Sequence, residues 1–294
     1  MVKVNKFSSI CLSSTSKNKK VELIASQVYE ILANKGCEVF HDSSLSRYSK
    51  VLDSKFRSDS FIVKNVDLII AIGGDGTILG CSRKYGSKGL PILGINLGKL
   101  GFLTDIQPHK ITSELIDVIE GKHLDDSRFF LDTKVKGAKR HLALNEIVIH
   151  SGAIAQLIEF DLFIDDIFVY RQKADGLIIN TPTGSTAYSL SGGGPIVHPS
   201  LNVFTILPMF PQSLSTSPLI VDSKSTLKVE LINKDTKAKL SFDSHESISI
   251  SGKTRIEIIK SKSQLTLIHP RDHDFFESCR TKLGWSTNLT SIQE

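Results

Sequence analysis

The sequence predicts an α/β, doubly wound N-terminal domain followed by a mostly antiparallel β domain. Over the first third of the chain, short apolar runs alternate with segments of helical period. Beyond about residue 125, the apolar residues instead recur at every second position. The chain has 294 residues, of which 40% are hydrophobic, enough for two cores. We expect domains at residues 1–120 and 121–270, with a C-terminal arm, residues 271–294, packing back on the first domain.

The first domain is predicted from four apolar runs, each suited to a strand. A helix over residues 20–34 follows the first run, because residues such as Ile24 and Val28 share one helical face. Gly36 ends this helix where a left-handed residue is expected. The run over residues 67–72 is rich in isoleucine, which is typical of a parallel strand buried on both faces. The strands are expected at residues 7–12, 37–40, 67–72 and 91–96.

The second domain is predicted from the alternation of apolar and charged residues. Leu227, Val229 and Leu231 are separated by charged residues, and similar alternation runs over residues 158–164 and 256–258. Side chains at every second position lie on one face of a strand, so these segments suit half-buried strands. Because they are short and have little helix between them, they predict an antiparallel arrangement.

Charge and cysteine spacing narrow the possible functions. Residues 1–110 carry 16 Lys and Arg against 9 Asp and Glu, a surplus of seven, which suits a polyphosphate ligand or a nucleic acid. Arginine-rich runs, zinc-finger spacing and aromatic-basic RNA motifs are missing, so we expect no nucleic-acid partner. The four cysteines are too far apart for a metal or redox pair, and we expect reduced, buried thiols. Without a signal peptide or a bilayer-spanning apolar stretch, we expect a cytoplasmic protein with no membrane partner.

The segment Gly73-Gly74-Asp75-Gly76-Thr77 lies between a predicted buried strand and a predicted helix. Glycines in such a turn let the backbone approach a ligand, and the helix N-terminus favours anionic oxygens. A carboxylate repels phosphate, so Asp75 is explained if it takes a proton from a hydroxyl or helps to hold a magnesium ion. The alternative is a tight strand-to-helix turn with Asp75 as its N-cap.

A second polar segment runs from Asp175 to Pro195 and contains the run TPTGSTAYSLSGGG. Its hydroxyl groups and glycines can line a polar ligand. Two structural explanations compete with this one. Asp175-Gly176 suits a hairpin turn between two strands, and Thr183 or Ser185 suits a helix cap. Together these explanations still leave the glycines at 192–194 unexplained.

These motifs in combination resemble the NAD kinase family. The family's signatures are a GGDG turn, an asparagine–glutamate pair in a downstream strand, and a DG…TPTGSTAY segment. They occur here in the same order, at Asp75, at Asn145-Glu146 and from Asp175 onward. The loop GINLGKLGFLT, residues 94–104, also resembles the family's loop beside the first motif, and the whole resemblance covers residues 66–285. GGDGT is shared with lipid kinases and phosphofructokinases, whereas TPTGSTAYSLS is highly specific.

The resemblance implies transfer of the γ-phosphate of ATP, with Mg²⁺ as cofactor, to the 2′-hydroxyl of NAD. Asp75 would be the catalytic base, Asp175 would lie near the nicotinamide, and residues 186–191 would form the adenine and ribose wall. Phe102 is open between packing on adenine and packing in the core. The implied nucleotide-binding residues are Asp75, Gly76, Asn145, Glu146, Gln156, Lys173, Asp175, Thr186, Ala187, Tyr188, Ser189, Leu190, Ser191 and His245.

Three of these positions differ from the pattern common in the family. Lys173 stands where many relatives have arginine, which keeps the charge but loses the planar guanidinium group. Gln156 stands where histidine is frequent, and His245 where glutamine is frequent. Because a lone histidine is usually structural, ligand contact by Gln156 and His245 stays open.

Two other functions would use parts of the same pattern. A lipid kinase shares the GGDGT turn, but it would need a different second motif and a membrane-facing apolar or polybasic surface. A non-catalytic NAD sensor could keep the adenine wall and lose Asp75, which is intact here. We therefore expect an ATP-dependent NAD kinase with NAD and ATP as substrates, assembled by its resemblance as a homodimer or homotetramer.

Overall fold

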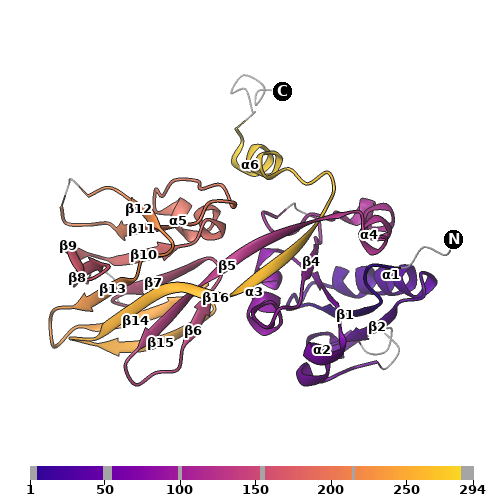
Figure 1. Ribbon diagram of the computed structural model, residues 1–294, viewed down its shortest axis with the longest axis horizontal. Helices are drawn as coiled ribbons and strands as arrows, with labels where there is room; N and C mark the ends of the chain where they lie inside the picture. Colours follow the sequence, from indigo (N-terminus) through magenta and orange to yellow (C-terminus); the bar gives the residue numbers. More distant parts are fainter. Residues whose placement is uncertain (1–4, 49–54, 99–100, 153–155, 214–215, 286–294) are drawn as a thin grey trace. The chain divides into compact units, whose positions relative to one another are not determined.

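The computed structural model describes residues 5–48, 55–98, 101–152, 156–213 and 216–285 (Figure 1). The chain divides into two compact units, one of residues 1–127 with 265–294, the other of residues 128–264. Two strands, β5 (His123–Val135) and β16 (Arg255–Pro270), belong in part to each unit. Lys99 and Leu100, which belong to the GINLGKLGFLT segment, lie outside the described residues. Among the described helices, none is both long and apolar enough to cross a membrane.

The first unit is built on a parallel sheet with the strand order β2-β1-β3-β4-β16. Every residue of β3 and β4 is buried, as expected of central parallel strands. Helices α1 and α4 bury their apolar faces in one core with Ile10, Leu12 and Ile70 of the sheet. The helix predicted over residues 20–34 is confirmed, and Gly36 has a φ of +75°. The elements are β1 (Ser9–Ser13), α1 (Lys20–Asn34), β2 (Glu38–His41), α2 (Asp59–Asn65), β3 (Leu68–Ile72), α3 (Asp75–Lys84), β4 (Ile92–Ile95) and α4 (Ile111–Ile119).

The second unit is a sandwich of two antiparallel sheets. One has the order β12-β11-β10-β7-β14-β15, and the other joins the first half of β16 to β13, β8 and β9. Val229 pairs with Leu162 and with Ile256, and all three are buried in one core, so the predicted alternation is confirmed. The predicted fold class is therefore confirmed in both units. The elements are β6 (His141–Ala143), β7 (Glu146–His150), β8 (Ile158–Ile164), β9 (Ile167–Ala174), β10 (Gly176–Asn180), α5 (Tyr188–Ser191), β11 (Val203–Met209), β12 (Leu219–Asp222), β13 (Leu227–Leu231), β14 (Lys237–Phe242) and β15 (Glu246–Ser251).

The chain changes sheets at Asp175. Strand β9 pairs with β8 in one sheet, whereas β10 pairs with β7 and β11 in the other. The hairpin explanation for Asp175-Gly176 is therefore wrong. A Cβ on Gly176 would lie 2.6 Å from the carbonyl oxygen of Ile149, so glycine is needed for this close strand pairing.

The segment after β16 forms α6 (Phe275–Leu283), which belongs to the first unit. The Asp274 carboxylate caps its N-terminus, and Gly284, with a φ of +68°, ends it. Ser278 and Cys279 are its buried residues. As the spacing predicted, all four thiols are buried and unbridged, namely those of Cys11, Cys37, Cys81 and Cys279.

Candidate active site

The glycine turn after β3 presents the N-terminus of α3 at the carboxyl edge of the parallel sheet. Gly74 is the N-cap and Asp75 is the first residue of the helix, so the explanation of Asp75 as an N-cap is wrong. A Cβ on Gly73 would lie 2.0 Å from Thr77 Oγ1, so the turn requires glycine there. A helix N-terminus exposed at this edge suits an anionic ligand.

The Asp75 carboxylate anchors the loop that follows β4. Its Oδ2 accepts a hydrogen bond from Phe102 N–H at 2.9 Å, and its Oδ1 accepts from Leu103 N–H at 3.2 Å. A Cβ on Gly101 would lie 2.0 Å from Asp75 Oδ1, so glycine allows this approach. Asp75 remains 31% exposed, which leaves it accessible to a ligand. The bonds with the loop orient the carboxylate, a role that its position in the turn does not predict.

A polar hollow of about 460 Å³ lies beside this turn, at the ends of β3 and β4. Asn96 orders its rim by accepting a hydrogen bond from Gly98 N–H at 2.7 Å. Lys20 contributes a cation, so the hollow suits a phosphate chain. It is lined by Asn18, Lys20, Gly74, Asn96, Leu97 and Gly98.

In the second unit, the Asn145-Glu146 pair stands at the start of β7 and is held by Asp243. The Asp243 carboxylate accepts hydrogen bonds from the N–H groups of Leu144 at 3.0 Å and Asn145 at 2.8 Å. A Cβ on Gly184 would lie 2.2 Å from the Asn145 carbonyl oxygen, so the TPTGST turn packs directly against this pair. Asp243 could not be predicted from the sequence, because nothing in the chain connects it with a motif 98 residues away.

Several buried polar atoms in this region have no hydrogen-bond partner among the described residues. They include Asn145 Oδ1, Glu146 Oε2 and Ser189 Oγ. Burial and the nearby Asp243 carboxylate raise the pKa of Glu146 to about 8. Glu146 is therefore mostly protonated at neutral pH and can donate a hydrogen bond. Because unpaired buried polar groups are costly, these atoms suit a polar ligand.

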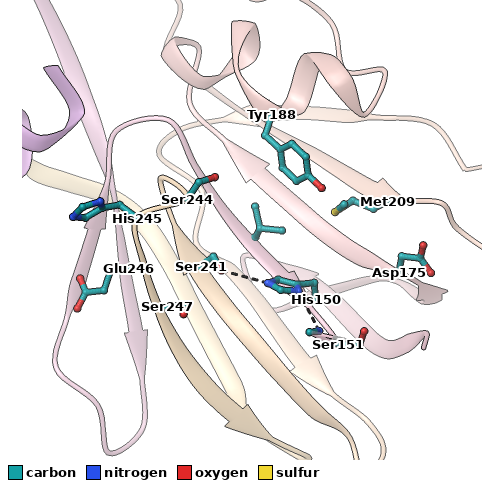
Figure 2. Close-up of a pocket in the computed structure, with 12 residues that line it drawn as sticks. His150, Ser151, Asp175, Tyr188, Met209, Ser241, Ser244, His245, Glu246 and Ser247 are labelled. Atoms are coloured by element: carbon teal, nitrogen blue, oxygen red, sulfur yellow. Dashed lines mark hydrogen bonds between the residues drawn. The ribbon is translucent and has the colours of Figure 1, made fainter. Parts of the chain in front are cut away.

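A cavity of about 650 Å³ opens between β7, β14 and the segment around Tyr188 (Figure 2). It brings together three of the residues implied by the resemblance, Asp175, Tyr188 and His245. Tyr188 is 44% exposed and hangs from α5 on one wall, with His150 on the opposite wall. The rest of the lining is Val148, Ser151, Gly152, Met209, Ser241, Ser244, Glu246 and Ser247.

His150 lines the cavity although no sequence motif includes it. Its Nδ1 accepts a hydrogen bond from Gly152 N–H at 3.1 Å, so its Nε2 carries the proton and faces Ser241 Oγ at 3.3 Å. Burial and the Lys239 cation lower the pKa of His150, which keeps the imidazole neutral. His150 ends strand β7, which begins at Glu146, and this position was the only signal that could have identified it.

None of the other implied residues of the second unit lines this cavity. Ser191 lines a second, more apolar cavity of about 430 Å³, whose wall includes Tyr188, Gly192 and Leu207. Gln156 is exposed, and Lys173 is half exposed with its Nζ 3.9 Å from Glu159 Oε2. Neither Gln156 nor Lys173 lines a described cavity.

One group in the first unit has the composition of a metal site, namely Asp105, His269 and His273. The Asp105 carboxylate contacts Nδ1 of both histidines, and His269 Nε2 lies 3.3 Å from Asp126 Oδ2. Burial opposes the charge on His269, but Asp105 and Asp126 raise its pKa to about 9. His269 is therefore a cation hydrogen-bonded on both sides, so the cluster is an ion pair that fastens the segment before α6.

Two domain families match the sequence. The ATP-NAD kinase N-terminal domain matches residues 10–123, and the ATP-NAD kinase C-terminal domain matches residues 144–270. An NAD kinase of Tolumonas auensis is 39% identical over 289 residues, which cover 96% of this chain and 98% of that protein. An NAD kinase of Marinobacter nauticus is 46% identical over 230 residues, 76% of this chain and 78% of the relative.

Two solved structures share this architecture. Yeast NADH kinase complexed with NADH aligns with a TM-score of 0.85 at 26% identity, covering 96% of this chain and 89% of that chain. An NAD kinase from Archaeoglobus fulgidus in complex with ATP aligns with a TM-score of 0.74 at 27% identity, covering 94% of this chain and 98% of that chain.

Proposed function

Because the chain belongs to the ATP-NAD kinase family and acts as an ATP-dependent NAD kinase, we propose that Asp75 is its catalytic base and that the second unit binds NAD. The observation that carries this assignment is the position of Asp75. It is an accessible carboxylate in the first turn of α3, beside a polar hollow that suits phosphates. A purely anion-binding turn would have no use for that negative charge.

In the proposed reaction, the 2′-oxygen of the NAD ribose attacks the γ-phosphorus of ATP. A bond forms between these atoms, and the bond from the phosphorus to the bridging oxygen of ADP breaks. The hydroxyl proton passes to the Asp75 carboxylate, which the N–H groups of Phe102 and Leu103 orient. Phosphoryl transfer depends mainly on alignment and charge stabilisation, which the α3 N-terminus and Lys20 would supply to the donor phosphates.

The assignment of NAD to the second unit rests on its unpaired buried groups. Asn145 Oδ1, Glu146 Oε2 and Ser189 Oγ would hydrogen-bond to the hydroxyls and adenine of the dinucleotide. Tyr188, half exposed beside the cavity, would give apolar contact to the adenosine half. Asp175 would lie at the nicotinamide end. His150 would also contact the dinucleotide, because it lies in the wall of the same cavity.

Three finer features belong to the same proposal. Mg²⁺ would enter with ATP to neutralise phosphate charge, and the accessible Asp75 carboxylate is suited to hold it. The protein would assemble as a homodimer or homotetramer, supported by the exposed apolar residues Ile167 and Phe168 on the edge strand β9. The four unbridged thiols support a reducing, cytoplasmic location.

The direct test is to incubate the purified full chain with MgATP and NAD and to measure NADP with an NADP-specific dehydrogenase. We expect NADP and ADP in equal amounts. Parallel reactions with NADH, inorganic polyphosphate and diacylglycerol define the acceptor and donor. Phosphorylation of the lipid in place of NAD would favour the lipid kinase, and NAD binding without turnover would favour a sensor.

A further inference from the structure

The C-terminal helix α6 brings a cation to Asp75. The Lys282 ammonium lies 3.7 Å from Asp75 Oδ2 and 4.6 Å from the centroid of the Phe102 ring. The backbone N–H of Phe102 also donates to Asp75 Oδ2, so the three residues form one cluster. The Phe102 ring therefore packs against the Lys282 ammonium. The sequence suggested only packing on adenine or in the core for this residue.

Helix α6 is held near Asp75 by contacts that do not involve Lys282. Ser278 and Cys279 are buried, and His273 before the helix contacts Asp105 Oδ1 at 3.0 Å. The rings of His273 and His269 stack with their centroids 3.9 Å apart. The segment is therefore positioned by its own packing, and Lys282 is delivered to Asp75 as a consequence.

The ion pair by itself does little for stability. The side chains of Lys282 and Asp75 are 30% and 31% exposed, and ion pairs of this kind contribute little to stability because solvent screens them. Holding a flexible lysine over an aromatic ring also costs conformational entropy. A cation held beside the turn that receives phosphate has a clearer use in phosphoryl transfer, where charge on the transferred group must be stabilised.

On the basis of the proposed function, we propose that Lys282 is a further catalytic residue, whose ammonium contacts the γ-phosphoryl group of ATP during transfer. It forms no covalent bond and gives up no proton. The long side chain moves from Asp75 Oδ2 to a γ-phosphate oxygen, which frees that Asp75 oxygen to accept the proton from the ribose hydroxyl. The C-terminal helix is thus part of the catalytic machinery.

The test uses the full chain with Lys282→Met, Lys282→Arg and the matched control Thr281→Ala, an exposed neighbour on the same helix. We expect Lys282→Met to lower kcat about a hundredfold, with the KM for NAD within about twofold of wild type. Arginine should restore most of the turnover because it keeps the charge, and Thr281→Ala should behave as wild type. Calorimetry should show that Lys282→Met weakens MgAMP-PNP binding and leaves MgADP binding unchanged.

Unchanged turnover and unchanged MgAMP-PNP affinity in Lys282→Met would overturn the proposal. So would an equal loss of affinity for NAD, MgADP and MgAMP-PNP together with a lower Tm, because that pattern indicates a structural role. Failure of the proposed function is a separate result, since it would appear as no NADP formed by the wild-type chain. In that event the comparison of MgAMP-PNP with MgADP still decides whether Lys282 recognises the γ-phosphate.

Discussion

Replacing Glu146 with glutamine tests the buried carboxyl group at the start of β7. Burial and the Asp243 carboxylate raise its pKa from 4.5 to about 8. The folded protein therefore keeps a proton over a pH range in which the unfolded chain has released it. The stability that this group contributes is fully present below about pH 4.5 and is lost as the pH rises through about 8. Glutamine has nearly the same shape and nothing to titrate, so the variant should lack this loss.

The size of the stability difference follows from the interval between the two pKa values, 4.5 and about 8. Between these pH values, the free energy of unfolding of wild type should fall relative to that of Glu146→Gln by about 1.4 kcal/mol per pH unit. Urea denaturation at about pH 5.5 and about pH 7.5 should therefore show a difference that grows by about 3 kcal/mol in favour of the variant. The control is Glu38→Gln on β2, an exposed position where the same substitution removes a solvated carboxylate. Parallel pH profiles for wild type and Glu146→Gln would refute the assignment of a protonated, buried Glu146.

Three further substitutions test the proposed site. Asp75→Asn should lower kcat by at least about a hundredfold with most NAD affinity kept, and near-normal turnover would remove Asp75 from the mechanism. Tyr188→Ala should weaken NAD binding by about 1–3 kcal/mol with little change in Tm, since the ring is 44% exposed; an unchanged NAD titration would contradict its place in the adenosine wall. Gly184→Ala would force a Cβ to 2.2 Å from the Asn145 carbonyl oxygen, so Tm should fall and the KM for NAD should rise more than that for ATP. An effect of Gly184→Ala confined to ATP would mean that the two substrates are assigned to the wrong units.

The elements were predictable where local pattern and burial agree. Helix α1 has a continuous apolar face and a terminal glycine in the left-handed region, so its bounds could be read from residues next to one another. Strand β13 alternates because its odd-numbered positions are buried in the core and its even-numbered positions are partly exposed. The structure at Asp175 could not be predicted from local sequence. An Asp-Gly pair suits both a hairpin and a crossing from one sheet to another, and only the long-range pairing of β9 and β10 distinguishes the two.

The environment of each candidate residue was less predictable than its identity. Asp75 is fixed by N–H groups that lie 27 and 28 residues further along the chain, and Asn145 by a carboxylate 98 residues away. Such bonds depend on how the loops close, which no local periodicity encodes. Lys282 carries no motif at all, and its proximity to Asp75 arises from a helix at the far end of the sequence.

The parallel sheet of the first unit combines strands from early and late in the sequence, so it is completed late in synthesis. Leu267 and Ile268 of β16 pair with Ile92 and Leu93 of β4, whereas Ile95 at the end of β4 already bridges Ile106. The part of the β4 edge at Ile92 and Leu93 therefore stays unpaired until β16 has been synthesised. An open parallel edge invites association with other chains, and all of residues 128–264 must emerge before this one is covered. A nascent chain stalled before β16 would therefore carry the complete GGDG turn on an unfinished sheet. Synthesis of β16 is therefore the step that closes this part of the sheet.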